Sequence, residues 1–302
     1  MNNPLLDIRI GTLVQGGIPD PANYIRQILP HGFESFQLFF WQTLGGKNLA
    51  ELALPVMDAV GDAAIISSLG VFGNPMGDTD IDRETLRGWE QAIDAAPLFG
   101  AKIVAGFTGR VRGKSIPDSI ARYKEVWGPL AERARDKGVR IAFENCQMGG
   151  SWGSGDWNIA HNPQAWELMF DALPHDNIGI EWEPCHQLAQ LIDPLPQLRE
   201  WLPSGKIFHI HGKDATVLRD VVAKHGITGG TPWVFHRTPG FGDTNWTDVI
   251  TDLRRFGYTG AIDIEGWHDP VYKGELEITG QVQGMRYLKA CRGGDVFVPN
   301  PT

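Results

Sequence analysis

Short apolar runs alternate with amphipathic segments along the whole chain. The runs are rich in β-branched and aromatic residues, and their nearly continuous hydrophobicity is typical of strands that are covered on both faces. We expect strands in eight runs, over residues 8–14, 32–41, 62–71, 100–109, 138–146, 177–183, 206–211 and 260–267. The amphipathic segments between the runs predict helices, among them 83–100, 120–138, 163–173 and 246–257.

Strands separated by helices indicate parallel βαβ units. Glycine precedes several runs, as at Gly100, Gly138 and Gly260, which is typical of a helix C-cap that leads into a strand. Eight such units fit a (β/α)₈ barrel better than an open sheet, which usually has about five to seven strands. The segment after the first strand also lacks the glycine motif with which open sheets hold phosphate groups. We therefore predict an α/β fold, a single (β/α)₈ barrel domain over residues 1–302, with a short tail from about residue 293.

The composition of the chain limits which partners and which cellular compartment we expect. The net charge is −9, whereas a surface that binds nucleic acid normally has a basic excess, so we expect no nucleic acid partner. No apolar run approaches the roughly 18–20 residues that span a bilayer, and the N-terminus lacks the pattern of a signal peptide. The three cysteines, Cys146, Cys185 and Cys291, are scattered and odd in number, which argues against a disulfide framework. We expect a cytoplasmic protein that does not contact a membrane.

The last four predicted strands each end in a residue that can bind a metal ion. In (β/α)₈ barrels the carboxyl ends of the strands form the active site. Each residue lies within its apolar run, whereas an acidic helix N-cap would follow the run. Buried glutamates need a partner, and a divalent cation compensates several carboxylates at once. The pattern predicts a metal site formed by Glu144, Glu183, His211 and Glu265.

Three carboxylates and one imidazole form a hard, oxygen-rich ligand set. It favours Mn²⁺, with Mg²⁺, Co²⁺ or Zn²⁺ as alternatives. Glu181 points to the same side of its strand as Glu183, because side chains alternate with a period of two. Two interpretations of Glu181 stay open. Either it orients a metal ligand, through His209 on the next strand, or it is a buried carboxylate paired with an arginine or lysine.

Several segments resemble a known family. They are "FEN" at residues 143–145, "IGIEWEPCH" at 178–186, "FHIHGKDA" at 208–215, and "RTPGFGDTNW" followed by "GYTGAIDIE" at 237–265. They resemble the xylose isomerase-like TIM barrels, which include sugar phosphate isomerases, ketose 3-epimerases and inosose dehydratases. The resemblance extends over nearly the whole chain and is strongest over about the last 160 residues.

This resemblance implies roles for individual residues. It assigns the metal ligands to the four strand-end residues named above, and the acid and base roles to Glu144 and Glu265. His186 would bind a substrate hydroxyl, with a solvent-facing loop histidine as the alternative. Gln37 stands where relatives often carry a glutamate and is a candidate substrate contact. Ketose 3-epimerases have an arginine shortly after the third ligand, which this chain lacks, and Arg237 is the candidate that replaces it.

Other polar and aromatic residues are candidates for substrate binding. Lys213 is suited to contact a hydroxyl or an anionic group, although a salt bridge to Asp214 or to another acid is an equal alternative. The glycine-rich loop 145–163 has the length and composition of a lid, and Asn162 with Pro163 predicts a helix start at its end. Tryptophan combines a flat apolar face with one donor, so we expect sugar platforms, with core packing as the alternative, at Trp152, Trp157 and Trp267.

Such a site predicts chemistry on a sugar. A divalent ion chelated by a carbonyl and a neighbouring hydroxyl stabilises the enediolate that forms when the adjacent carbon loses its proton. We expect a metal-dependent sugar isomerase or epimerase. The alternative is a lyase that acts by β-elimination on a 3-oxo-sugar, as inosose dehydratases and C-glycoside deglycosidases do, for which the many tryptophans would suit an aromatic aglycone. The resemblance also implies a homo-oligomer and, for a deglycosidase, a small β-rich partner subunit.

Two further classes fit less well. A phosphodiesterase similar to endonuclease IV, a distant relative, needs a histidine-rich zinc cluster and a DNA-facing surface, which the acidic charge disfavours. A barrel that only binds a sugar leaves the clustered carboxylates unexplained.

Overall fold

The eight apolar runs form the strands of a closed parallel barrel in the computed structural model, which describes residues 3–301. Around the barrel the strands follow one another in the order β1-β10-β7-β6-β5-β4-β3-β2, which is their order along the chain read backwards from β1. The predicted (β/α)₈ architecture is therefore confirmed. The barrel strands are β1 (Ile8–Gln15), β2 (Ser35–Trp41), β3 (Ile65–Phe72), β4 (Ile103–Gly106), β5 (Arg140–Glu144), β6 (Ile178–Trp182), β7 (Ile207–Gly212) and β10 (Gly260–Ile264).

The four predicted helices are also present, and their ends follow local sequence signals. Asn162 caps α5 by accepting a hydrogen bond from the backbone N–H of Ala165, and Pro163 is the first helical residue, as predicted. Gly100 and Gly138, which precede strands, have positive φ angles of 65° and 68°. The helices are α1 (Pro21–Ile28), α2 (Leu49–Val60), α3 (Asp80–Ala95), α4 (Ile116–Asp136), α5 (Pro163–Ala172), α6 (Pro184–Leu188), α7 (Pro194–Trp201), α8 (Arg219–His225), α9 (Trp246–Arg255) and α10 (Glu277–Arg292).

The chain divides into two compact units. Unit 1 consists of Met1–Thr12, Glu183–Pro203 and His211–Thr302, and unit 2 consists of Leu13–Trp182 and Ser204–Ile210. The extent of a single domain over residues 1–302 stays a prediction.

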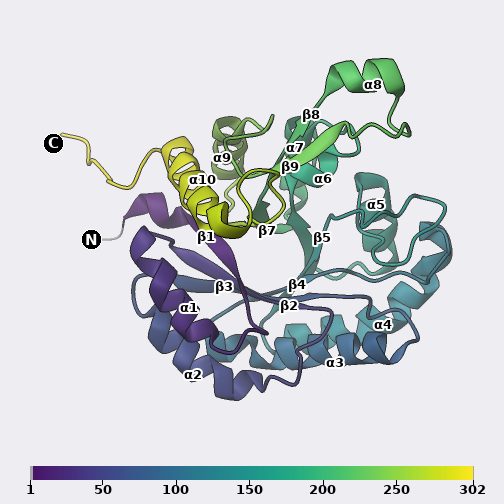
Figure 1. The fold of residues 1–302 in the computed structure, drawn as a ribbon. Helices are drawn as coiled ribbons and strands as arrows, with labels where there is room; N and C mark the ends of the chain where they lie inside the picture. Colours follow the sequence, from purple (N-terminus) through teal and green to yellow (C-terminus); the bar gives the residue numbers. More distant parts are fainter. Residues whose placement is uncertain (1–2, 302) are drawn as a thin grey trace. The chain divides into compact units, whose positions relative to one another are not determined.

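Unit 2 contains a large aromatic core between its strands and helices. Helices α2, α3 and α4 lie along one side of strands β2 to β5 (Figure 1). The ring of Trp127 packs edge-to-face on Trp89, with ring centroids 4.7 Å apart, and on Phe143, at 4.5 Å. The indole N–H of Trp127 also donates to the carbonyl oxygen of Thr108 at 2.8 Å. These buried contacts fix the strands of unit 2 against their helices.

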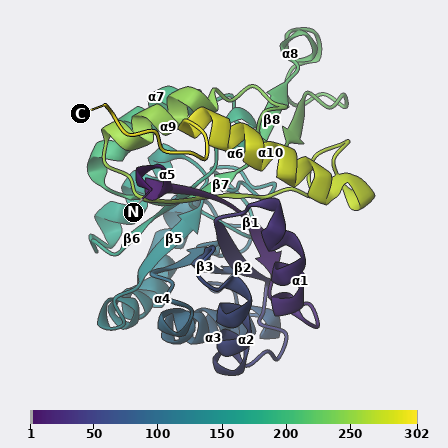
Figure 2. The same ribbon diagram turned by 90° about the vertical axis from the view of Figure 1, so that its left-hand side faces the viewer.

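In unit 1 the beginning of the first barrel strand packs against the C-terminal part of the chain. Strand β1 pairs with β10, and helices α9 and α10 lie side by side (Figure 2). The buried guanidinium group of Arg292 donates to the carbonyl oxygen of Ile8 at 2.9 Å. Arg254 makes two hydrogen bonds with the carboxylate of Asp7, both 2.9 Å long.

A hairpin inserted in unit 1 is not anticipated by the sequence pattern. Strands β8 (Asp214–Val217) and β9 (Val234–Arg237) pair antiparallel outside the barrel. Helix α8 protrudes from this hairpin (Figures 1 and 2). Each strand has only four residues, which is too short for an alternating pattern to be recognised.

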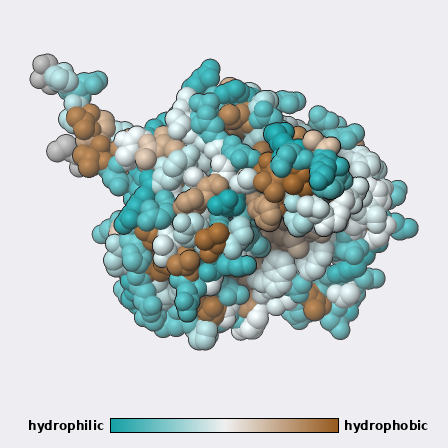
Figure 3. Space-filling model, turned by 45° about the horizontal axis from the view of Figure 1, so that its top comes forward, coloured by the Kyte–Doolittle hydropathy of each residue, from teal (hydrophilic) through white to brown (hydrophobic). Residues whose placement is uncertain are grey.

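Some apolar side chains remain on the surface. In the segment that follows α10, at the upper left of Figure 3, Val296 is 76% and Val298 is 78% exposed. Within residues 3–301, the length and apolarity needed to cross a bilayer are not found together in any helix.

A substitution at Gly106 tests whether β3 and β4 approach each other as closely as the structure shows. It has a φ of 143°, and a Cβ atom there would lie 2.0 Å from the carbonyl oxygen of Val71. We expect Gly106→Ala to lower the free energy of unfolding by about 3 kcal/mol or more, measured by urea denaturation. Gly88→Ala in α3 is the control, because a Cβ atom at Gly88 meets its nearest neighbour at an ordinary 3.5 Å. Equal stability of the two variants would contradict this interpretation.

Candidate metal centre

Three of the four predicted ligands converge in unit 1. Glu183 directly follows β6, His211 lies in β7, and Glu265 directly follows β10. The Nδ1 atom of His211 is 3.4 Å from Oε2 of Glu183 and 3.6 Å from Oε2 of Glu265. The potential ligand atoms of these three residues lie within 4.8 Å of one another, and all three side chains are buried.

Lys213 lies between the two carboxylates. Its Nζ atom is 3.1 Å from Oε1 of Glu183 and 3.0 Å from Oε2 of Glu265, and the residue is only 2% exposed. The alternative that Lys213 pairs with an acid is therefore confirmed, but the partners are the two glutamates. Asp214 instead accepts hydrogen bonds from the backbone N–H groups of Ala215 and Thr244.

The local charges keep both glutamates ionised. Burial alone would raise the pKa of Glu183, but His186 and the ammonium group of Lys213 act in the opposite direction, and the net pKa lies well below its usual range. Burial also opposes the ionisation of Glu265, while Lys213 and the hydrogen bond with His211 hold its pKa well below the usual range. Two negative charges and one positive charge are therefore buried together.

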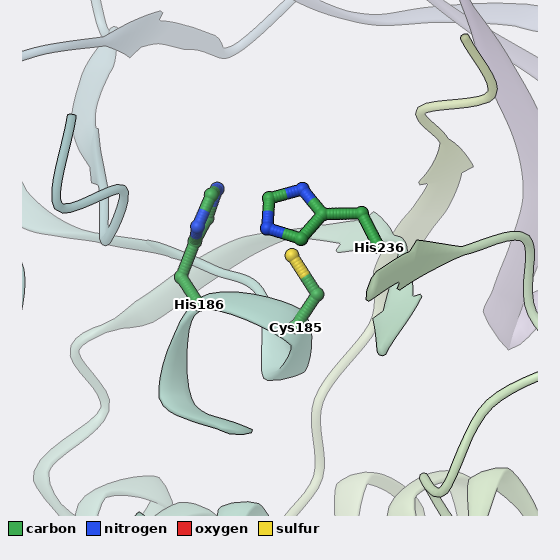
Figure 4. Close-up of side chains that lie close together, drawn as sticks. All are labelled: Cys185, His186 and His236. Atoms are coloured by element: carbon green, nitrogen blue, oxygen red, sulfur yellow. The ribbon is translucent and has the colours of Figure 1, made fainter. Parts of the chain in front are cut away.

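Imidazole groups and one thiol surround these carboxylates. Figure 4 shows the side chains of Cys185 and His186, from α6, and of His236, from β9, pointing toward one another. Their potential ligand atoms lie within 4.8 Å of one another. The thiol of Cys185 donates to Oε1 of Glu183 at 2.7 Å, and Nε2 of His186 is 3.3 Å from the same oxygen. We assign these residues to the carboxylate site because two of the three contact Glu183.

The histidines of this group are neutral at physiological pH. Burial lowers the pKa of His186 to about 3 and that of His236 to about 4. His186 is only 6% exposed, so the alternative of a solvent-facing loop histidine is wrong. The rings of His186 and His236 are 5.2 Å apart, and His268 follows at 5.7 Å from His236. Neutral imidazoles both donate and accept hydrogen bonds, as sugar hydroxyls require.

Two of these histidines, His236 and His268, are difficult to recognise as site residues from the sequence. His236 lies on the unanticipated β8–β9 hairpin. His268 places Nε2 2.9 Å from Oε1 of Glu265. His268 stands three residues after the strand-end Glu265, and His186 stands three residues after the strand-end Glu183. This shared spacing is the sequence feature that could have identified His268 as a site residue.

Unit 2 contains the fourth predicted ligand and a buried polar network. Glu144 is buried at the end of β5, and its backbone oxygen accepts a hydrogen bond from Asn158 at 2.8 Å. The strand register pairs Glu181 with His209, and His209 Nδ1 lies 2.8 Å from Glu181 Oε1, which is the contact that one of the two open interpretations of Glu181 requires. The buried amide of Gln37 donates to the same oxygen at 2.6 Å. The contacts of Glu181 thus include a glutamine and a histidine.

The remaining candidates for substrate contacts differ in their surroundings. Arg237 donates to Asp269 at 3.1 Å, so an acid already pairs with this arginine. Trp267 is half-buried beside His268, with ring centroids 5.6 Å apart. Trp157 lies beside Trp41, with centroids 5.8 Å apart.

The loop that was expected to act as a lid is anchored at two places. The buried guanidinium group of Arg110 donates to the carbonyl oxygens of Ser151, at 2.7 Å, and of Trp152, at 3.2 Å. Asn158 accepts hydrogen bonds from the N–H and the hydroxyl of Thr108. These bonds hold the loop against the segment that follows β4.

The sequence and the fold agree on one family. Residues 25–291 match the family described as xylose isomerase-like TIM barrel. The chain belongs to this family. No curated protein sequence matches the chain.

Solved structures with the same fold carry the names of sugar-converting enzymes. The apo form of 3-keto-D-glucoside 4-epimerase from E. coli has a TM-score of 0.67 and 14% identity, over 94% of this chain and 100% of that chain. D-psicose 3-epimerase, in the presence of D-fructose, has a TM-score of 0.66 and 14% identity, over 95% and 100%. Mannonate dehydratase from Streptococcus suis serotype 2 has a TM-score of 0.67 and 13% identity, over 94% of both chains. At these identities the similarity shows the xylose isomerase-like fold.

A substitution of Lys213 tests whether its ammonium group compensates the buried charges of Glu183 and Glu265. Replacing it with methionine leaves two buried carboxylates without the ammonium group between them. We expect Lys213→Met, measured by urea denaturation at neutral pH without added metal, to lower the free energy of unfolding by about 3 kcal/mol. The control is Lys224→Met, because Lys224 is exposed on α8. A loss no larger than that of the control would show that Lys213 does not stabilise the pair.

Proposed function

We propose that this protein is a divalent-metal-dependent enzyme that isomerises or epimerises a sugar by removing the proton next to a carbonyl group. The observation that carries the proposal is the convergence of Glu183, His211 and Glu265 in a buried place. Family membership supports it, and so do the names of two structures with the same fold, a 4-epimerase and a 3-epimerase.

The donor set fits a divalent cation. Two ionised carboxylates and one imidazole are donors that Mn²⁺ accepts, and Mg²⁺, Co²⁺ and Zn²⁺ are the alternatives. The two carboxylates have one ammonium group between them, so a further positive charge balances the site. We assign Glu144 as the fourth ligand, because it ends β5 as the other ligands end or follow their strands. Glu183 stands where the family more often carries an aspartate, and the longer side chain suits bidentate binding.

Glu265 and Glu144 are the proposed acid and base. The carboxylate of Glu265 is ionised and therefore able to accept a proton, and His268 lies 2.9 Å from its Oε1 atom. A carboxylate with a low pKa is a weak base, so the reaction requires an acidified C–H bond, which a bound cation supplies by polarising the neighbouring carbonyl. The neutral imidazoles of His186 and His236 bind substrate hydroxyls and orient the sugar.

A lyase is the second candidate. Proton removal next to a carbonyl also begins a β-elimination, and mannonate dehydratase has the same fold. The substrate would then be a 3-oxo-glycoside or an inosose, and a deglycosidase would have a small β-rich partner subunit. For either reaction we propose a cytoplasmic homo-oligomer.

Deuterium exchange distinguishes the two reactions. We expect the protein with Mn²⁺ in D₂O to exchange one C–H of a ketose and to interconvert two sugars, because enediolate formation is reversible. Release of an aglycone or of water from a 3-oxo-glycoside or an inosose, without interconversion, would indicate the lyase. Proton and carbon nuclear magnetic resonance (NMR) spectra of a ketose panel, a 3-oxo-glycoside and an inosose provide the measurement. Exchange that persists at full rate after EDTA treatment would contradict metal dependence.

Glu265→Gln tests the proposed ligand and base. The amide keeps the shape but removes the charge, so we expect weaker Mn²⁺ binding by isothermal titration calorimetry. The turnover number should fall by at least about 100-fold. Glu275→Gln is the matched control, because Glu275 is an exposed carboxylate ten residues further along the chain. Near-normal turnover of Glu265→Gln would remove Glu265 from the acid and base role.

A further inference from the structure

Two elements of unit 1 bring a thiol and two imidazoles together beside the carboxylates. Helix α6 carries Cys185 and His186, and strand β9 of the hairpin carries His236. Their side chains point toward one another (Figure 4), and their potential ligand atoms lie within 4.8 Å of one another. The sequence did not predict any of the three as a metal ligand. This group, here called the Cys185–His186–His236 cluster, differs in its donors from the carboxylate site that it adjoins.

Apolar packing holds α6 against the hairpin. Cys185 lies in a buried cluster with Ala215 and Val217 of β8, and Val234 of β9 packs against the same cluster. The thiol lies at the polar edge of this packing, because its Sγ atom is 2.7 Å from Oε1 of Glu183. Core packing therefore explains why residue 185 is apolar and small, but not why it presents a sulfur atom to a carboxylate.

Hydrogen bonds fix the end of the hairpin strand that carries His236. Arg237 donates to Oδ2 of Asp269 at 3.1 Å, and the backbone N–H of Thr238 donates to the same oxygen at 3.0 Å. Asp269 is only 1% exposed, so these bonds are shielded from water. The ring of His236 is thereby held 5.2 Å from that of His186.

One ring nitrogen of the cluster is buried without a hydrogen bond. Within residues 3–301, Nε2 of His186 has no hydrogen-bond partner, and the residue is only 6% exposed. The atom lies 3.3 Å from Oε1 of Glu183, without the alignment of a hydrogen bond. A buried polar atom in this state has lost its hydrogen bond to water and gained none in return. A cation provides a partner for both atoms, since imidazole nitrogens and carboxylate oxygens are metal ligands.

The donors of the cluster favour a softer cation than the carboxylate site does. Thiolate and imidazole ligands suit Zn²⁺, whereas oxygen ligands suit Mg²⁺ and Mn²⁺. Zn–N bonds of about 2.0–2.1 Å and Zn–S bonds of about 2.3 Å place the ligand atoms of a tetrahedral site roughly 3–4 Å apart. The 3.3 Å between His186 Nε2 and Glu183 Oε1 lies in that range. The shorter contact between Sγ and Oε1 widens when an ion takes the place of the thiol proton.

The buried charges also accommodate a cation. Glu183 and Glu265 carry two negative charges and Lys213 carries one positive charge, which leaves one negative charge uncompensated. When a divalent ion binds a cysteine, the thiol proton leaves to solvent and the sulfur coordinates as a thiolate. The ion and the thiolate together add one positive charge, so the group becomes neutral.

We propose that the Cys185–His186–His236 cluster binds a divalent cation of the zinc class at a site of its own. The bound ion connects α6 to the hairpin. Since the proposed function assigns His186 and His236 to sugar hydroxyls, zinc and the sugar exclude each other, and zinc inhibits turnover. This inhibition rests on the proposed function, whereas the binding of the ion does not.

Cobalt tests the cluster, because a bond between Co²⁺ and a thiolate gives a charge-transfer absorption band that oxygen and imidazole ligands do not give. We expect this near-ultraviolet band when the protein, freed of metal with EDTA and then desalted, is titrated with Co²⁺. Its final intensity should correspond to one cobalt–thiolate bond per chain. Zn²⁺ added afterwards should remove the band, since sites of thiolate and imidazole favour Zn²⁺.

Variants show whether the band comes from the cluster. We expect Cys185→Ser to abolish the band and to lower the affinity for Zn²⁺ by at least about 100-fold, measured by competition with a zinc-binding dye. His236→Gln, which keeps the thiol, should lower this affinity by at least about 10-fold. Cys291→Ser is the matched control, because Cys291 is a free cysteine of α10 outside the cluster, and it should keep the band. Circular dichroism verifies that each variant is folded.

The absence of the band at every Co²⁺ concentration would overturn the site, and so would a band that survives Cys185→Ser. An unchanged affinity for Zn²⁺ in His236→Gln would overturn it as well. These outcomes are distinct from a failure of the proposed function, which shows as absence of metal-dependent C–H exchange in the unaltered protein without zinc.

Discussion

Two ionised carboxylates in a buried place are the constraint on which the candidate site depends. Burial opposes the negative charge of Glu183 and of Glu265, and both contact the ammonium group of Lys213. One ammonium group compensates one of the two charges, and an uncompensated charge is costly where water is excluded. A divalent cation balances such a pair, and His211, close to both carboxylates, provides a further donor.

The two units supply different chemistry at their strand ends. In unit 1 the carboxylates are surrounded by neutral imidazoles, because burial lowers the pKa of His186 to about 3 and of His236 to about 4. Neutral imidazoles bind hydroxyl groups without adding positive charge that would repel a cation. In unit 2 the strand ends carry aromatic side chains, and the rings of Trp41 and Trp157 lie 5.8 Å apart.

The sequence by itself determined the barrel and the residue types at its strand ends. Both are local properties, since apolar runs of strand length and the residues that end them are visible without knowledge of distant segments. Period-two alternation indicated that Glu181 and His209 face the same way on neighbouring strands, and the structure shows that their side chains meet. The capped start of α5 at Asn162 was predictable for the same reason, as a cap depends on a few adjacent residues.

Only the tertiary structure decided which partner each polar side chain contacts. Lys213 is next to Asp214 in the chain but pairs with Glu183 and Glu265, and Arg237, a candidate substrate contact, pairs with Asp269. The glycine-rich loop 145–163 resembles a lid in composition, yet bonds from the segment after β4 anchor it. Such pairings depend on distances between segments that are far apart in sequence. A pattern of hydrophobic and polar positions records which way a side chain faces, but not what lies opposite.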